Sequence, residues 1–355
     1  MTTGAKHDVV VVGASAGGVE ALTRFVAGLP ADLPAAVLVV LHIPPRAPSA
    51  LPAILARSGP LPARTAGEDE PLVAGTILVA PPDHHLVVRE AGATVVRGPR
   101  ENGHRPSLDA LFRTAAVHLG PRVVAVVLSG SDDDGTSGAV AVRRRGGLVA
   151  VQDPDDAMYR IMPASVARRA GPVAAAPAEE LGSLVADLVR EGPQAEAAGP
   201  DATLEQEAAG PNAALEQEAA VEENLVEAVL GERNGEPSGY ACPDCSGVLF
   251  VQSQDTVLRF RCRIGHAWTA DGLVAQQDIM VETALWSAVR TLREKAELSE
   301  RLAHRAREDG RRVSAHHFQE AAQEAHRSAV VLRELLSSPG LGRYPAEGAG
   351  QTGAS

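Results

Sequence analysis

Short apolar runs that alternate with helical patterns are the feature that most constrains the fold of residues 8–175. Strands that alternate with helices predict an α/β fold with a doubly wound, mostly parallel sheet. The candidate strands are Val9–Val12, Ala36–Leu41, Thr76–Ala80, Val123–Leu128 and Leu148–Val151, with helices expected at Gly18–Ala27, Ser107–His118 and Gly138–Arg145. The last three strands are nearly continuous in Val, Ile and Leu, as strands buried on both faces are. One pair of runs, HLVV and TVVR around Ala91-Gly92, instead predicts an antiparallel hairpin.

The composition changes after residue 183, where Ala, Glu, Gln, Pro and Gly dominate as far as residue 235. Here GPDATLEQEAA (199–209) is followed at once by GPNAALEQEAA (210–220). One duplicated unit is too short for a solenoid, so we interpret 184–235 as an acidic, partly helical linker. The expected organisation is therefore a domain at 1–183, the linker, a cysteine-bearing module at 236–270, a helical hairpin at 271–338 and a disordered tail at 339–355.

Bulk properties exclude several classes of protein. A formal net charge of −12 disfavours nucleic acid as a main partner. No apolar run approaches the ~20 residues that span a bilayer, and the N-terminal sequence MTTGAKHD has no apolar signal region. The three cysteines all lie within residues 242–262, which suits metal binding in a reducing compartment better than disulfides. We therefore expect a cytoplasmic protein without nucleic-acid partners or membrane insertion.

The stretch VVVVGASAGGVEAL (9–22) predicts a strand, a tight turn and a helix, a junction that serves two unrelated chemistries. A dinucleotide-binding loop would need glycine where Ser15 stands and an acidic residue where the second strand ends in His42. A Walker loop would need a Gly-Lys-Ser/Thr sequence that is missing here. Residues Gly13–Gly17 instead match G-x-S-x-G, which presents a nucleophilic serine. A glycine-rich turn with a buried serine is the structural alternative.

Two further strand ends favour the nucleophile. A catalytic serine needs a base, for which His42 is the candidate, and the base needs an orienting carboxylate. The run Asp132-Asp133-Asp134 follows the strand that ends near Leu128. Because the carboxyl ends of parallel strands share one edge of a sheet, we expect Ser15, His42 and one of these aspartates to converge. A structural turn at His42 and a helix cap in the aspartate run are the alternatives.

At these residues the sequence resembles a known family, the catalytic domain of bacterial chemotaxis protein-glutamate methylesterases. The matching segments, in family order over roughly residues 7–180, are VVGASAGGVEAL, LVVLHIPP, ILVAPPDHHL, NGHRPSLDALFRTAA, VVLSGSDDDGTSGAVAVRRRGG and VQDPDDAMYRIMPASV. The resemblance implies a Ser-His-Asp esterase, without a catalytic cofactor. It would hydrolyse glutamate γ-methyl esters on the cytoplasmic helices of methyl-accepting chemoreceptors. Many members also deamidate receptor glutamines.

Carried over by position, Ser15 would be the nucleophile, His42 the general base and Asp134 the orienting acid. Asp132 and Asp133 depart from the family, which more often has Gly and Asn there, so either could share the role of Asp134.

Other matching positions carry weaker implications. Met162 would be a pocket wall and the amide of Ala16 an oxyanion donor. Ser107 is most simply a helix N-cap. His84 and His85 are expected to be loop or rim residues, and Arg105 could steer acidic receptor helices. Because the first strand begins within ten residues of Met1, we expect a form without an N-terminal receiver domain.

Four soft ligands flank a predicted hairpin in the cysteine-bearing module. Cys242-x2-Cys245 and Cys262-x3-His266 have the spacing of a small zinc ribbon. Four protein ligands leave no open position, so we expect a structural Zn²⁺; unrelated buried thiols are the alternative. This segment also resembles a C-terminal module fused to many stand-alone homologues of these esterases. The helical hairpin after it would either bind other chemosensory proteins or only pack on the ribbon.

Two other functions remain open from the sequence. The esterase domain could serve as a non-catalytic signalling scaffold, with the ribbon and helices as the interacting part. It could also hydrolyse small-molecule esters without preference for receptors.

Overall fold

The chain forms two compact units, residues 1–272 and 273–355. The computed structural model describes residues 7–45, 49–191, 236–254 and 257–337. The eleven-residue repeat of the predicted linker and the predicted tail lie outside the described residues. Within the described ranges, no helix is both long and apolar enough to cross a bilayer.

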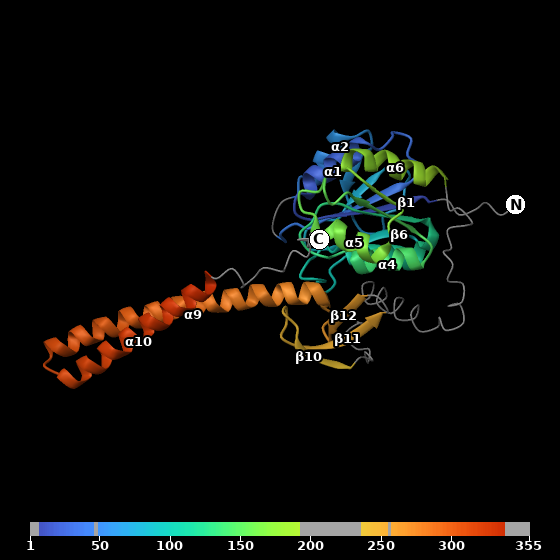
Figure 1. Ribbon diagram of the computed structural model, residues 1–355. Coiled ribbons are helices and arrows are strands. Elements are labelled where there is room, and N and C mark those ends of the chain that lie inside the picture. Colours follow the sequence, from blue (N-terminus) through green and yellow to red (C-terminus); the bar gives the residue numbers. More distant parts are fainter. Residues whose placement is uncertain (1–6, 46–48, 192–235, 255–256, 338–355) are drawn as a thin grey trace, which may run out of the picture. The chain divides into compact units, whose positions relative to one another are not determined.

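A parallel sheet of seven strands organises the first unit, which confirms the predicted α/β class. Its strand order is β3-β4-β2-β1-β7-β8-β9, with every neighbouring pair parallel. Figure 1 shows α1, α2 and α6 over one face, and α4 and α5 over the other. The strands are β1 (Val9–Ala14), β2 (Ala36–Leu41), β3 (Ala63–Thr65), β4 (Ile77–Val79), β7 (Val123–Val127), β8 (Leu148–Gln152) and β9 (Ala174–Ala176). The helices are α1 (Gly18–Ala27), α2 (Leu51–Ser58), α3 (Leu108–Leu119), α4 (Thr136–Arg144), α5 (Ile161–Ala170) and α6 (Ala178–Glu191).

The central strand β1 shows why a valine run suits this position. Val9 and Val11 enter the core on one face, whereas Val10 and Val12 enter the core on the other. All four side chains are fully buried, because alternate residues of a strand point to opposite faces and helices cover both. The predicted antiparallel hairpin is β5 (His85–Arg89) paired with β6 (Gly92–Val96).

Short or weakly patterned elements were absent from the sequence prediction. The strand β9 is only Ala174–Ala176, and alanine has little preference for strands. Helix α6 continues to Glu191, eight residues past the expected boundary at residue 183. It continues because Val185 and Val189 are buried in the core that also contains α1.

The cysteine-bearing module is an antiparallel sheet of four strands rather than a hairpin alone. The predicted hairpin is β11 (Val248–Gln254) paired with β12 (Val257–Cys262). Two short strands, β10 (Pro237–Ala241) and β13 (Ala267–Thr269), extend it on either side.

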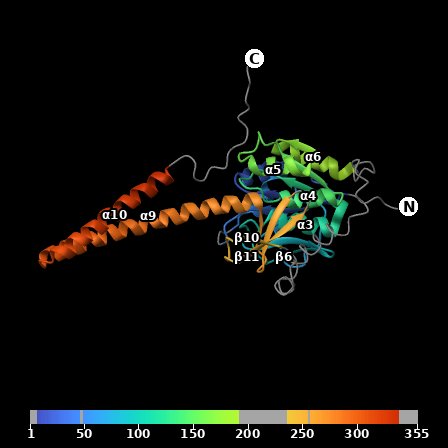
Figure 2. The ribbon, with the colours of Figure 1, turned by 60° about the horizontal axis from the view of Figure 1, so that its bottom comes forward.

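Two long helices follow, α9 (Ala270–Glu308) and α10 (Arg312–Leu336), as predicted for the helical hairpin. They lie side by side in both views (Figures 1 and 2). The break between them falls at Asp309-Gly310, where Gly310 adopts φ +72°. The buried seam is made mostly of small side chains at spacings of three and four residues, which allows close approach of the helices. Its members are Val289, Ala296, Ser299, Ala303 and Ala306 of α9 and Ala315, Ala322, Ala325 and Ala329 of α10.

Candidate active site

The three neighbouring strands β2, β1 and β7 bring together the residues singled out from the sequence. Ser15 follows β1, His42 follows β2, and the aspartate run lies in the loop after β7. The chain moves from β1 to β2 on one side, whereas β7 joins β1 on the other. Sites in doubly wound sheets form at such a switch point, outside the carboxyl ends of the strands.

Backbone geometry holds Ser15 at the top of β1. Its N–H donates to the Ser129 carbonyl at 2.9 Å, and its own carbonyl accepts from Gly18 N–H at 2.9 Å. The second bond fixes the Ser15–Ala16 peptide plane and therefore the direction of the Ala16 N–H. Gly17 adopts φ +70°, and a Cβ there would lie 2.8 Å from Ser129 Oγ. The turn therefore requires glycine at Gly17 for both its backbone conformation and its close packing.

Hydrogen bonds connect the three predicted side chains in sequence. His42 Nδ1 lies 3.1 Å from Ser15 Oγ, and His42 Nε2 lies 2.9 Å from Asp134 Oδ2. The side chain of His42 is 5% exposed and that of Asp134 is fully buried. A neutral histidine with its proton on Nε2 would donate to Asp134 and accept from Ser15.

The N-terminus of helix α3 holds Asp134 in place. The Leu108 and Asp109 N–H groups donate to its carboxylate at 2.6 and 3.3 Å. Ser107 occupies the predicted N-cap position of α3, but its hydroxyl donates to Asp134 Oδ1 at 2.9 Å and not to a backbone N–H of the helix. Amide donors and the positive end of a helix dipole favour an anion here.

The other two aspartates of the run have different surroundings. Asp132 Oδ2 lies 3.4 Å from His42 Nδ1, on the side of the ring that faces Ser15. Asp133 is buried and accepts from the hydroxyl of Thr269, away from His42. Of the three, Asp134 therefore occupies the position of an orienting acid, opposite the serine.

His104 is a neighbour of the site to which the sequence assigned no role. Its ring stacks on His42 with centroids 3.7 Å apart and an interplanar angle of 11°. His104 Nε2 lies 3.3 Å from Asp132 Oδ2, so one carboxylate contacts both rings. No signal in the sequence could identify this contact, because His104 lies on a loop far from the strand ends.

The carboxylates around His42 control its protonation. Burial lowers the pKa of His42, but the hydrogen bonds and charges of Asp132 and Asp134 outweigh burial and raise it to about 9. Burial also opposes ionisation of Asp134, yet its hydrogen bond to His42 holds the pKa of Asp134 below the ordinary value. Near neutral pH these carboxylates therefore favour the protonated, imidazolium form of His42.

Asp132→Asn should move the pH dependence of esterase activity to lower pH. Neutral His42 is the form that can accept a proton from Ser15, so wild-type activity should rise as the pH approaches about 9. Asparagine removes one anion beside the ring, while Asp134 and the stacked His104 remain. Loss of such a contact lowers a histidine pKa by about one unit or more. The measurement is kcat/KM across the neutral and alkaline range.

Asp32→Asn is the matched control, because Asp32 is exposed and pairs with Arg190 at the surface. An inflection at the same pH in wild type and Asp132→Asn would show that Asp132 does not set the pKa of His42.

The remaining predicted residues are structural in their contacts. Met162 is fully buried, and a Cβ built on Gly130 would lie 2.6 Å from its Sδ, so it packs under the loop after β7. His85, expected on a loop or rim, is instead buried at the start of β5, where it bonds the Pro99 carbonyl and the Ser107 N–H. Arg105 pairs with Asp83 within the domain.

A serine, a histidine and a carboxylate bonded in this order on a doubly wound sheet are the arrangement of α/β serine hydrolases, and the first unit belongs to that class. Within this class, the family of the domain can also be identified. Residues 10–185, about half of the chain, match the CheB methylesterase model, and this domain belongs to the CheB methylesterase family.

Curated relatives agree with this assignment. A protein-glutamate methylesterase/protein-glutamine glutaminase of Caulobacter vibrioides is 39% identical over 188 residues, which is 52% of this chain and 54% of the relative. One from Anaeromyxobacter dehalogenans is 44% identical over 165 residues, 46% of this chain and 48% of the relative. The chain thus spans about half the length of the curated relatives it matches. The crystal structure of the Thermotoga maritima CheB methylesterase catalytic domain is 29% identical, covers 51% of this chain and 98% of its own, and has a TM-score of 0.49.

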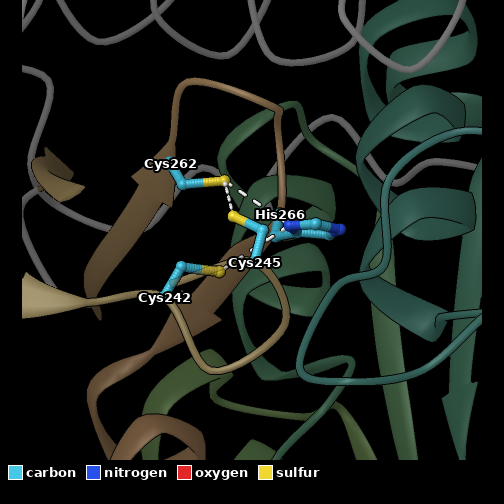
Figure 3. Close-up of side chains that lie close together, drawn as sticks. All are labelled: Cys242, Cys245, Cys262 and His266. Atoms are coloured by element: carbon cyan, nitrogen blue, oxygen red, sulfur yellow. Dashed lines mark hydrogen bonds between the residues drawn. The ribbon is translucent and has the colours of Figure 1, made fainter. Parts of the chain in front are cut away.

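The four predicted metal ligands converge in the cysteine-bearing module (Figure 3). Cys245 Sγ lies 3.6 Å from Cys262 Sγ, and His266 Nδ1 lies 3.7 Å from Cys242 Sγ and 3.5 Å from Cys262 Sγ. A tetrahedral zinc ion with usual bond lengths separates two sulfurs by about 3.8 Å and sulfur from nitrogen by about 3.6 Å. The cysteines are not disulfide-bonded. The donor set and its spacing therefore fit a four-coordinate zinc ion.

Proposed function

We propose that this protein hydrolyses glutamate γ-methyl esters on methyl-accepting chemoreceptors. The observation that carries the proposal is the contact chain from Ser15 through His42 to Asp134 within a CheB methylesterase domain. The relatives named above are methylesterases by name, and the contact chain supplies the groups that ester hydrolysis needs. The receptor helices that carry these esters would place the reaction in the cytoplasm.

The proposed reaction proceeds through an acyl-enzyme. Ser15 Oγ attacks the ester carbonyl carbon while neutral His42 takes the hydroxyl proton at Nδ1. Asp134, bonded at Nε2, stabilises the imidazolium that forms. The Ala16 N–H, fixed by the bond from Gly18 to the Ser15 carbonyl, would stabilise the oxyanion. His42 then protonates the departing methoxide, which leaves as methanol. Water, deprotonated by His42, cleaves the acyl-enzyme and regenerates glutamate and the serine hydroxyl.

The same groups support deamidation of receptor glutamines. An amide carbonyl would be attacked in the same way, and His42 would protonate the departing amide nitrogen, which leaves as ammonia. The double name of the relatives includes a protein-glutamine glutaminase activity. We therefore include this second reaction in the proposal.

Release of methanol from a methylated receptor cytoplasmic fragment tests the main proposal. The comparison substrates are the same fragment with its modified glutamates replaced by alanine, and a small-molecule ester. Release from the first alone supports a receptor methylesterase. Equal rates on the small ester would favour the small-molecule esterase. Labelling of Ser15 by a fluorophosphonate without turnover would show the wrong substrate, and no labelling would favour the non-catalytic scaffold.

We also propose that Cys242, Cys245, Cys262 and His266 hold a structural Zn²⁺. Four protein ligands leave no position for a substrate or water, so the ion would stabilise the module without entering the reaction. A sheet of this size has too small a core to be stable alone.

His266→Ala should reduce bound zinc from about one equivalent to a small fraction and lower the melting temperature. The fourth ligand would be replaced by water, and the ion would be lost to a chelator. The measurements are zinc content by mass spectrometry and thermal unfolding. His316→Ala, at an exposed position of α10, is the control and should retain the metal. Wild-type protein purified without stoichiometric metal would contradict the zinc site.

The helical hairpin is our proposed binding surface for other chemosensory proteins. It exposes apolar side chains, including Leu298, Val313 and Val331, that a partner helix could cover. Receptor signalling domains are themselves helical, which suits this mode of recognition.

A further inference from the structure

The cysteine-bearing module is joined by backbone hydrogen bonds to a loop beside the candidate active site. The Ala267 N–H donates to the Arg100 carbonyl at 3.2 Å, and the Asn102 N–H donates to the Ala267 carbonyl at 2.8 Å. Glu101 and Ala267 form a parallel bridge, so this loop continues the sheet beyond β13. A Cβ built on Gly103 would lie 3.3 Å from the Trp268 ring. The module therefore packs directly against the loop that precedes α3.

A buried cluster of charges fixes this contact. Glu101 is 2% exposed and accepts from Arg113 of α3 at 2.7 Å. Two arginines of β12 complete its shell, Arg259 at 3.2 Å and Arg261 at 3.1 Å. Buried charges are costly unless they are paired, so the carboxylate holds the module arginines at this face.

A second set of contacts runs from the module to Asp134. The Thr269 N–H donates to Asn102 Oδ1 at 2.8 Å, and Thr269 Oγ1 donates to Asp133 Oδ1 at 2.9 Å. Asn102 Nδ2 in turn donates to Asp134 Oδ1 at 3.3 Å. The Thr269 N–H can only donate, so the side-chain atom of Asn102 that faces it must be the amide oxygen. The amide nitrogen then faces Asp134, which as a carboxylate can only accept.

We propose that Thr269 and Asn102 are positioning residues, through which the cysteine-bearing module orients the carboxylate of Asp134. At the N-terminus of α3, Ser107 bonds Oδ1 and Leu108 bonds Oδ2 of this carboxylate, and the module adds a further bond to Oδ1 through Asn102. Thr269 also fixes Asp133, the residue next to Asp134 in the chain. This role rests on the serine-esterase function proposed above. Both residues are buried and bond the aspartate run, so both act through the direction in which Asp134 meets His42.

Two substitutions in the full-length protein remove the contacts separately. Thr269→Val keeps the shape and the backbone N–H but removes the hydroxyl, which donates to Asp133 and accepts from the Gly272 N–H. Asn102→Gly removes the amide bridge and is compatible with the backbone there, because Asn102 has φ +49°. Thr269→Ser retains a hydroxyl and should rescue. Thr76→Val is the matched control, since its hydroxyl donates to the Val73 carbonyl before β4, at the opposite end of the strands.

The readouts are kcat and KM for ester hydrolysis, the pH profile and the rate of fluorophosphonate labelling of Ser15. We expect kcat to fall about three- to tenfold in Thr269→Val, through the lost hydrogen bond to Asp133, and about tenfold or more in Asn102→Gly, with KM little changed. The alkaline inflection of the pH profile should also shift, because the pKa of His42 depends on the position of Asp134. Thr269→Ser and Thr76→Val should behave as wild type.

Thermal unfolding separates positioning from stability. If a variant is folded at the assay temperature and still shows the lower kcat and labelling rate, the positioning role is supported. Folded Thr269→Val and Asn102→Gly with wild-type kcat, labelling and pH profile would overturn it. A wild-type protein whose Ser15 does not label would overturn the esterase function itself, and the positioning role with it.

Discussion

Ser15→Ala should lower kcat/KM for methanol release by at least about a thousandfold. The substitution removes the only atom in the contact chain that can form the acyl-enzyme, and His42 would have no hydroxyl to deprotonate. Alanine fits the turn, since the neighbouring Ala14 and Ala16 are already small, so the fold should persist. The measurements are methanol release from the methylated receptor fragment and covalent labelling by a fluorophosphonate.

Ser183→Ala is the matched control for this change. Its hydroxyl donates to the Glu180 carbonyl on the exposed side of α6, remote from the sheet edge that carries the site. Activity and labelling should be unchanged there. Residual methanol release by Ser15→Ala within tenfold of wild type would exclude Ser15 as the nucleophile.

Asp134→Asn should also have a large effect, a fall in kcat of about 10⁴-fold, as when the same change is made in other serine triads. An asparagine amide can present its NH₂ group to His42, which would place the histidine proton on Nδ1, facing Ser15. That tautomer cannot accept the serine proton. The amide also loses the charge that stabilises imidazolium, so the pKa of His42 should fall from about 9. Steady-state kinetics and a histidine titration by NMR would measure both effects.

Asp155→Asn provides the control, because the Asp155 side chain is 84% exposed and pairs only loosely with Arg160 at 3.3 Å. It should leave kcat and the titration unchanged. If Asp134→Asn retains wild-type kcat, one of its neighbours in the aspartate run must serve as the acid.

Periodicity and strand order explain how much of the fold was predictable. The strands β1, β2, β7 and β8 are buried on both faces, so each appears in the sequence as a nearly continuous apolar run that can be identified directly. By contrast, β9 and helix α6 derive their stability from the core that surrounds them, and alanine-rich segments carry little local signal. Sequence patterns also predicted the hairpin but not β10 and β13, which are short strands that pair at its edges.

The candidate site was predictable to the extent that it follows strand ends. Ser15, His42 and the aspartate run could be placed at one edge because parallel strands end together. The hydrogen-bond network around Asp133 and Asp134 could not, because Ser107, Asn102 and Thr269 lie on segments with no shared periodicity. Their meeting depends on tertiary contacts across up to 167 residues of sequence. Patterns in a single sequence report local structure and carry little information about such pairs.

The buried shell of Glu101 bears on whether this chain can be dissected. Composition alone suggests a cut in the predicted linker, residues 184–235. A truncation after α6 would keep Glu101 and Arg113 but remove Arg259 and Arg261, and it would expose the edge that β13 now pairs. The excised module would carry two arginines without their carboxylate. The methylesterase domain and the cysteine-bearing module look separable in the sequence. We expect each to be less stable without the other.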